Sequence, residues 1–306
     1  MKSSFPSEGV FAALWIPTDS EGRLLRSALA AHLAWLRSCG VQGVLALGST
    51  GDFPRFDLEQ RKALLSTIAE LAAPMQVIAN VSDLRQEVCV ALARHAQSLG
   101  LAGISIMPPS FYPVSQADQL AFFLHVSGSC ELPVMLYNFP ELTCNRIGLE
   151  TIAAFADRAP MAGIKQSGGE FSYHNELIAL GREKGFNVFS GADTRLNEVF
   201  ALGATGCIGG LVNFVPEYMV SIFRACRKGS NEDITLAVAR MKEVGSFIDK
   251  LTFPWNVSAG VVARGFEAGA PRSVVSPHSA TLHGTIVADL RQRFEAWGLP
   301  LPRLAA

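Results

Sequence analysis

The sequence predicts an α/β protein built as a (β/α)8 TIM barrel with a C-terminal helical extension. Eight short apolar segments rich in β-branched residues alternate with longer segments of helical period. Strand–helix units repeated at this spacing require parallel strands joined by helical crossovers, and eight such units close into a barrel. A doubly wound open sheet is the competing architecture, but no GxGxxG turn follows the first strand, which argues against it.

The alternation of strands and helices runs through the first two thirds of the chain. Strands are predicted at residues 10–16, 43–47, 76–80, 103–107, 134–137, 161–165, 187–190 and 206–208. Helices are predicted at residues 24–39, 58–71, 86–99, 117–127, 149–155 and 173–183. Gly and Pro gather between these elements, as in 48-GSTGDFPR-55 and 107-MPPSFYP-113, which indicates loops there.

From about Val215 onward the pattern is helical only. Helices are predicted at residues 216–227, 233–251, 257–265 and 280–297. One of them is expected to close the barrel and the others to form the extension. No linker or low-complexity stretch separates them from the barrel. We therefore expect a barrel over residues 1–227, with C-terminal helices over residues 228–306 that pack on it and are not an independent domain.

Composition narrows the class of protein and its partners. Hydrophobic residues make up 49% of the 306 residues and charged residues 17%, which is typical of a globular chain that buries further surface in a homo-oligomer. A net charge of −1 gives no reason to expect nucleic acid or an anionic membrane as a partner. Residues 1–9 lack the apolar segment of a signal peptide, and no apolar run reaches the length of a membrane span. Six scattered cysteines without a CxxC pair indicate a reduced, cytoplasmic compartment.

One lysine occupies a position that suggests chemistry. Lys165 ends the apolar run 161-MAGIK-165, whereas the other lysines lie near the terminus or in polar helical stretches. A polar residue at the C-terminal end of a barrel strand points into the site formed by the βα loops. Desolvation there disfavours the ammonium form, so we expect a nucleophilic amine that forms a Schiff base with a carbonyl substrate. The alternative is a lysine paired with a carboxylate at the barrel rim.

A tyrosine is expected at the same face as this lysine. Tyr137 ends the preceding strand, in 137-YNFP-140, and neighbouring parallel strands end on the same side. A phenol there can exchange protons with a reacting oxygen. The alternative is a tyrosine that only packs its ring and bonds a backbone carbonyl.

Two glycine-containing segments complete the candidate site. In the loop 48-GSTGD-52, the hydroxyls of Ser49 and Thr50 lie between Gly48 and Gly51, which suits a carboxylate but also fits an ordinary turn with a helix cap. The last strand ends in 206-GCIGG-210, whose glycines are expected to leave open space beside the lysine, and Ile208 and Gly210 are expected to bind substrate there. Neither segment has the spacing of a phosphate-binding loop.

Taken in this order, the segments GSTGD, YNFP and GIKQSGGE resemble the dihydrodipicolinate synthase / N-acetylneuraminate lyase superfamily. The resemblance implies a (β/α)8 barrel, a class I pyruvate-type aldolase mechanism and commonly a homotetramer, with a dimer also considered. It assigns Lys165 as the Schiff-base lysine and Tyr137 as the proton-shuttling tyrosine. It assigns Ser49 and Thr50 to the carboxylate of the 2-oxo acid, with Thr50 also in a hydroxyl relay. Gly48, Gly51 and Ser167 are expected to bind substrate beside them.

Three departures from the pattern bear on the substrate. Leu142 stands where the synthases usually carry an arginine for a second carboxylate, which argues against that synthase. After the seventh strand, Asp193 matches the first acid of the pair that grips sugar hydroxyls in sialic acid lyases, but Thr194 replaces the second. The relay tyrosine that the family takes from a neighbouring subunit falls on Phe111 or, with another alignment, on Ser110, and Tyr112 lies next to them.

These features predict a Schiff-base lyase that cleaves or forms a carbon–carbon bond, giving pyruvate and an aldehyde from a 2-keto-3-deoxy sugar acid or a 4-hydroxy-2-oxo acid. The alternatives are a Schiff-base dehydratase of a keto-deoxy sugar acid, dihydrodipicolinate synthase or N-acetylneuraminate lyase proper, and a barrel that binds a 2-oxo acid without turnover. No cofactor is expected. No metal is expected either, because the histidines form no HExxH or comparable ligand spacing.

Overall fold

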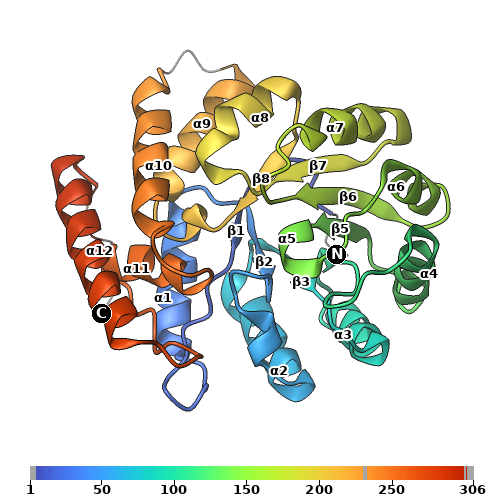
Figure 1. Cartoon of the computed structure of the whole chain (residues 1–306), viewed down its shortest axis with the longest axis horizontal. Helices are drawn as coiled ribbons and strands as arrows, with labels where there is room; N and C mark the ends of the chain where they lie inside the picture. The colour runs from blue at the N-terminus through green and yellow to red at the C-terminus, as the bar shows by residue number, and fades with distance from the viewer. Residues whose placement is uncertain (1–4, 230–232, 300, 302–306) are drawn as a thin grey trace.

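The computed structural model describes residues 5–229, 233–299 and 301, and in them eight parallel strands form a closed barrel. The strands are β1 (Gly9–Ala13), β2 (Gly43–Ala46), β3 (Gln76–Asn80), β4 (Gly103–Ile106), β5 (Val134–Asn138), β6 (Met161–Gln166), β7 (Asn187–Ser190) and β8 (Gly206–Gly209). Each pairs with the next, and β8 pairs with β1, where Phe11 is in register with Ile208 (Figure 1). The predicted (β/α)8 barrel is confirmed, and closure excludes the doubly wound open sheet.

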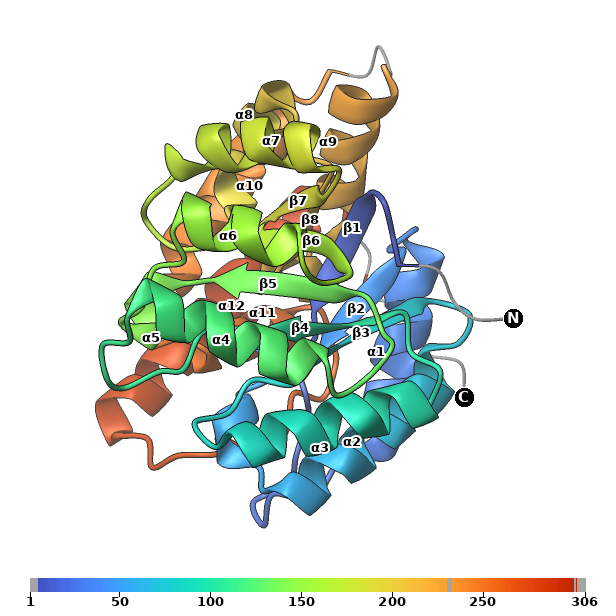
Figure 2. The same cartoon turned by 90° about the vertical axis from the view of Figure 1, so that its right-hand side faces the viewer.

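Helices surround the barrel on the outside (Figures 1 and 2). They are α1 (Arg26–Ser38), α2 (Leu58–Ala72), α3 (Gln86–Ser98), α4 (Gln116–Ser127), α6 (Leu149–Ala156), α7 (Tyr173–Lys184), α8 (Leu196–Leu202) and α9 (Pro216–Lys228). The C-terminal helices are α10 (Thr235–Ile248), α11 (Trp255–Ala263) and α12 (Pro277–Ala296). Among the described residues, no helix is long and apolar enough to cross a membrane.

Short elements differ from the sequence prediction. The first strand ends at Ala13 and not at Ile16, although the segment that follows remains buried. The helix α8 was not predicted, since its seven residues are too short to establish a helical period. The loops after β5, β2, β7 and β8 also contain single turns: α5 (Pro140–Thr143), η1 (Phe53–Arg55), η2 (Asp193–Arg195) and η3 (Leu211–Asn213).

The core has two layers, which follow from the alternation of side chains along each strand. One set packs between the strands and the helices, as Val10 and Ala12 do. The other set fills the barrel interior, as Phe11 does, and is completed by Ala13, Leu45, Ile78, Met107, Met135, Tyr137, Phe189 and Ile208. The inner layer forms the bottom of the candidate site, since Tyr137 and Ile208 belong to both.

The C-terminal helices lie against one side of the barrel (Figure 1). The helix α10 contacts α9 and η2, α11 contacts η3, and α12 packs on α11. Two of these helices therefore touch the loops that follow β7 and β8, at the C-terminal end of the barrel. Part of the predicted extension, residues 230–232, 300 and 302–306, and the first four residues of the expected polar N-terminus lie outside the described residues.

Candidate active site

The strands β5 and β6 bring the tyrosine and the lysine together. Tyr137 and Lys165 are in register on adjacent parallel strands, so both side chains point to the inner face of the barrel. The Lys165 Nζ atom donates a hydrogen bond of 3.0 Å to the Tyr137 hydroxyl oxygen. The two residues are 3% and 1% exposed, so this polar pair is enclosed and not a rim ion pair. A neighbouring bond, from Asn138 Nδ2 to Gln166 Oε1, ties the same two strand ends together.

The loop after β2 supplies the third polar group. Ser49 Oγ lies 2.9 Å from the Tyr137 hydroxyl. Since that oxygen accepts from Lys165, its own hydrogen can be donated to Ser49, which gives a chain from lysine to tyrosine to serine. Thr50 is buried and faces the same cavity, but Ser49 and not Thr50 contacts the tyrosine. In this structure the chain of hydrogen bonds from Lys165 through Tyr137 thus reaches Ser49, the neighbour of Thr50.

The backbone of this loop is strained, and hydrogen bonds from Asn80 and Arg272 hold it in place. Leu47 has a φ of +55° and Asp52 a φ of +56°, both in the left-handed region that non-glycine residues rarely occupy. Asn80 Nδ2 donates to the Leu47 carbonyl at 2.7 Å. On the other side of the loop, Arg272 Nη2 donates to the Gly51 carbonyl at 3.0 Å. The loop is thus clamped on both sides of its two hydroxyls.

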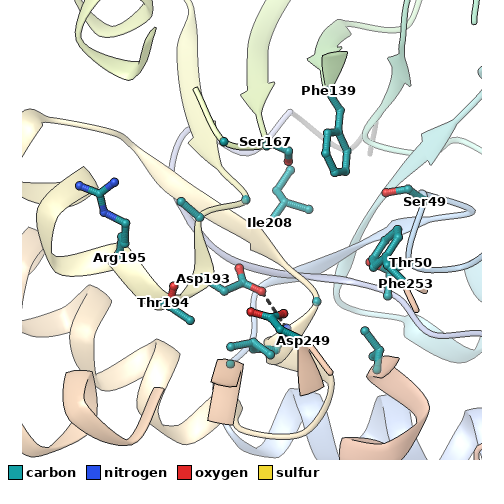
Figure 3. A pocket seen from close by; sticks show the side chains of 18 of the residues that line it. Ser49, Thr50, Phe139, Ser167, Asp193, Thr194, Arg195, Ile208, Asp249 and Phe253 are labelled. Carbon is teal, nitrogen blue, oxygen red and sulfur yellow. Dashed lines mark hydrogen bonds between the residues drawn. The ribbon is translucent and has the colours of Figure 1, made fainter. Parts of the chain in front are cut away.

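A cavity of about 480 Å³ at this end of the barrel is lined by the tyrosine and the lysine. Figure 3 shows this cavity from close by. Eight of the residues expected in the site line it: Ser49, Thr50, Tyr137, Lys165, Ser167, Asp193, Ile208 and Gly210. Gly191 has no side chain, and this leaves space for its neighbours in the cavity wall. A Cβ at Gly191 would collide with Ser167 Oγ and lie 3.3 Å from Lys165 Cε. The size suits a small organic acid.

Four expected positions do not line this cavity. Gly48 is backed by Leu45, and a Cβ at Gly51 would lie 3.0 Å from the Leu14 carbonyl, so these glycines shape the loop from behind. Phe111 and Tyr112 are 71% and 70% exposed, and their rings contact each other edge to face at 4.8 Å. Phe111 has a φ of +79°, which turns this pair outward on the single chain.

Asp193 is the second ionisable group at the cavity. Its Oδ2 atom accepts from the Leu211 backbone N–H at 2.8 Å, while its Oδ1 atom is shielded from solvent and has no hydrogen-bond partner in the described part of the chain. Burial raises the pKa of this carboxyl to about 6, against the opposing effects of the Leu211 N–H, the Lys165 charge and the Gly210 N–H. A Cβ at Gly209 would collide with Oδ1, so only glycine allows the carboxylate this position.

Several residues that line the cavity were not predicted. Phe139 and Phe171 form apolar parts of the wall, and Asp249, Phe253 and Asn256 reach it from the C-terminal helices and the loop between them. Phe139 belongs to the YNFP segment and could have been predicted from the sequence, because it lies two positions after Tyr137 and such residues share one face of a strand. The other positions carry no local pattern, because the fold alone brings them to the barrel mouth.

Leu142 lies outside the lysine cavity. It lines a neighbouring cavity of about 500 Å³, together with Ser110, Leu84 and Phe253. Within the described residues no group of three or more His, Cys, Asp and Glu side chains is arranged to hold a metal ion. The polar groups that line the lysine cavity include an amine, hydroxyls and carboxylates.

A buried lysine bonded to a tyrosine at the C-terminal end of a (β/α)8 barrel defines a lyase of the class I aldolase type. The model of the Dihydrodipicolinate synthetase family matches residues 6–293, so the chain belongs to this family. The resemblance found from its motifs is confirmed.

Individual relatives agree with this assignment. A putative 2-dehydro-3-deoxy-D-gluconate aldolase, YagE of Escherichia coli (strain K12), is 31% identical over 73% of this chain and 77% of its own. The 4-hydroxy-tetrahydrodipicolinate synthase of Natronomonas pharaonis is 27% identical over 88% of this chain and 92% of its own. The crystal structure of YagE from E. coli K12 in complex with pyruvate superimposes with a TM-score of 0.86 and 26% identity, covering 96% and 99% of the two chains.

Proposed function

We propose that this protein is an aldolase that carries pyruvate as a Schiff base on Lys165 and cleaves or forms a 2-keto-3-deoxy sugar acid or a 4-hydroxy-2-oxo acid. The observation that carries the proposal is the buried chain from Lys165 Nζ through the Tyr137 hydroxyl to Ser49 Oγ. An amine that must attack a carbonyl and lose water needs a proton carrier within hydrogen-bond distance. Tyr137 occupies that position.

The residues support the following sequence in the cleavage direction. The Lys165 amine adds to the C2 carbonyl of the substrate, and the resulting carbinolamine loses water to give a protonated imine. Tyr137, linked to Ser49, accepts the proton of the C4 hydroxyl while the bond between C3 and C4 breaks and an aldehyde leaves. The electron pair of that bond is held as an enamine, which takes a proton at C3. Water then adds to the imine and releases pyruvate and the free lysine.

Ser49 and Thr50 are proposed to hold the carboxylate of the 2-oxo acid. Both are buried at the cavity, and their loop is clamped so that hydroxyl and backbone N–H groups can meet an anion without a cation beside it. Ser167, Ile208 and Gly210 are proposed to shape the space around the reacting carbons. The crystal structure of YagE in complex with pyruvate supports a 2-oxo acid as the ligand.

Borohydride trapping tests the proposal. Incubation with pyruvate and borohydride is expected to leave a reduced pyruvyl adduct on the peptide that contains Lys165, detected by peptide mass spectrometry. Lys165→Ala should abolish both adduct and turnover, whereas Lys62→Ala, which removes a half-buried lysine paired with Glu59 on α2, should change neither. Retained turnover in Lys165→Ala would rule out the mechanism.

Product analysis separates the remaining alternatives. Pyruvate release from 2-keto-3-deoxy sugar acids, followed with a coupled dehydrogenase, supports the aldolase. Substrate loss without pyruvate would assign the protein as a dehydratase that uses the same Schiff base. An adduct without turnover of any such acid would indicate a barrel that only binds 2-oxo acids.

A further inference from the structure

The part of the cavity beside η2 is completed by the C-terminal helices. Asp193 and Thr194 come from η2, Asp249 ends α10, and Asn256 lies on α11. Figure 3 shows the carboxylates of Asp193 and Asp249 on the side of the cavity away from Ser49. The substrate tail must point to this part of the cavity if the 2-oxo end is held by Lys165 and the loop after β2.

In the described chain, two buried oxygen acceptors of this region have no hydrogen-bond donor. Asn256 is only 6% exposed, and its Oδ1 atom has no hydrogen-bond partner in the described chain. The Oδ1 atom of Asp193 is also buried and also has no hydrogen-bond partner there. Buried acceptors without a donor are costly and rare, so a ligand that brings donors is expected there. A hydroxyl group donates, and a carboxylate does not.

The charge in this region is negative. Among the described residues that line the cavity, Arg195 is the one cation besides Lys165. Its Nε and Nη2 atoms bond Glu198 at 3.1 and 2.5 Å, and its guanidinium lies 3.4 Å from the centre of the Phe171 ring. Arg195 is therefore already paired, and its side chain points away from Asp249 in Figure 3. A second substrate carboxylate would meet Asp193 and Asp249 without a free cation.

We infer that Asp249 and Asn256, acting with Asp193, select a substrate whose tail is neutral and hydroxylated and reject a tail that ends in a second carboxylate. This inference rests on the proposed function, because it assumes that the 2-oxo end is on Lys165. The physical reason is that hydroxyls satisfy the open acceptors, while a carboxylate leaves them open and is repelled by two like charges.

A matched pair of substrates tests the selection. 2-Keto-3-deoxygluconate and 2-keto-3-deoxyglucarate have the same length and differ only in carrying a hydroxymethyl group or a carboxylate at C6. Cleavage releases pyruvate from both, so one coupled assay measures both. The wild-type kcat/KM is expected to be about 10- to 100-fold higher for the neutral substrate at low ionic strength. Equal or better cleavage of the dicarboxylate would overturn the inference.

Variants assign the selection to these residues. Asp249→Asn should reduce the ratio of the two kcat/KM values by about tenfold, and Asp249→Lys should raise the dicarboxylate rate further. Asn256→Ala should lower kcat/KM for the neutral substrate by about tenfold and leave that for the dicarboxylate nearly unchanged. Glu267→Gln, which removes an exposed carboxylate outside the cavity, is the matched control and should not change the ratio. An unchanged ratio in both Asp249 variants would overturn the inference.

Pyruvate trapping distinguishes this inference from the proposed function. It needs only Lys165 and the 2-oxo end, so the reduced pyruvyl adduct on Lys165 should still form in the Asp249→Asn and Asn256→Ala variants. Normal trapping with no tail selection would overturn the inference and leave the aldolase proposal standing. Failure of wild-type trapping would remove both.

Discussion

At the scale of single residues, the Tyr137 hydroxyl is the atom on which the proposed chemistry depends. It accepts from Lys165 Nζ at 3.0 Å and lies 2.9 Å from Ser49 Oγ. No other protein group bridges the lysine and the loop after β2 among the described hydrogen bonds. The hydroxyl can therefore move a proton between the imine nitrogen and a reacting oxygen, while the ring fills the barrel interior.

Tyr137→Phe keeps the ring and removes only this hydroxyl. We expect kcat to fall by about 10²- to 10⁴-fold, the usual contribution of a positioned acid–base group, with the KM for the 2-oxo acid changed by less than about threefold. Steady-state kinetics measures both quantities. A large rise in KM with kcat preserved would show that Tyr137 binds substrate and does not transfer protons.

We expect the free energy of unfolding to depend on pH through the buried carboxyl of Asp193. Burial raises its pKa from 3.8 to about 6, so the folded protein holds this proton more tightly than the unfolded chain does. The ionised carboxylate therefore costs stability above about pH 6, and the cost disappears as the pH falls below 4. Asp193→Asn removes the charge and can keep the bond from the Leu211 N–H. We expect the variant to gain about 2 kcal/mol over wild type at pH 8 and nothing at pH 4.

Urea unfolding of both proteins across this pH range checks the prediction. The control Glu267→Gln should show no such pH-dependent difference, since its side chain is exposed. A gain for Asp193→Asn that does not grow as the pH rises from 4 to 8 would contradict the raised pKa. Greater stability together with weaker cleavage of hydroxylated substrates would show that the carboxylate is retained for function.

At the scale of elements, the loop after β2 depends on a residue far away in the chain. Arg272, between α11 and α12, donates to the carbonyls of Gly51 and Ile16 and pairs with Asp52. Its guanidinium also lies 5.1 Å from the Trp15 ring centre, and the side chain is only 6% exposed. The planar fork suits several acceptors at once, which a lysine cannot match. Arg272 is thus a positioning residue for Ser49 and Thr50.

Arg272→Lys should raise the KM for the 2-oxo acid and lower kcat/KM by about tenfold or more, because a shift of the loop misplaces both hydroxyls. Arg272→Ala should also lower the free energy of unfolding by about 2–4 kcal/mol, since it removes the donor to the Gly51 and Ile16 carbonyls and leaves Asp52 with only the more distant Arg55. Arg26→Ala removes an exposed arginine paired with Glu70 and is the control. Wild-type KM in a folded Arg272→Lys protein would contradict the positioning role.

At the scale of the whole molecule, the single chain exposes large apolar side chains beside its second cavity. Phe111, Tyr112 and Leu84 are mostly exposed, and Leu142 is 43% exposed. Leu84 and Leu142 line that cavity with Ser110. Exposed apolar surface of this kind is typical of contacts between subunits. We therefore propose a homo-oligomer, a dimer or a tetramer, in which this surface is covered.

Light scattering with size-exclusion chromatography should give a mass of at least two chains. Phe111→Glu, placed at a left-handed backbone position on this surface, should shift the mass toward that of one chain at micromolar concentration. Val274→Glu, at another exposed apolar residue, is the control and should leave the mass unchanged. A wild-type protein of single-chain mass would contradict the assembly.

Much of the architecture could be predicted from the sequence, and the reasons are local. Strands such as Gln76–Asn80 are short apolar runs, and helices such as Gln86–Ser98 show a helical period, so their order alone implies a barrel. Lys165 and Tyr137 were found because a polar residue ending an apolar strand is unusual. The four-residue α5 and the seven-residue α8 were missed because such short segments contain too few residues to show a period.

The barrel, the family motifs and a lysine and a tyrosine at neighbouring strand ends could all be predicted from the sequence. They depend on patterns within a few residues and on the fixed geometry of parallel strands. Three contacts could be seen only in the folded protein: Ser49 and not Thr50 bonds Tyr137, Asp249 and Asn256 line the cavity, and Arg272 bonds the loop after β2. These contacts join segments up to 221 residues apart, as the bond from Arg272 to Gly51 does. Their partners are chosen by how the helices pack on the closed barrel, and no local pattern in the chain records that choice.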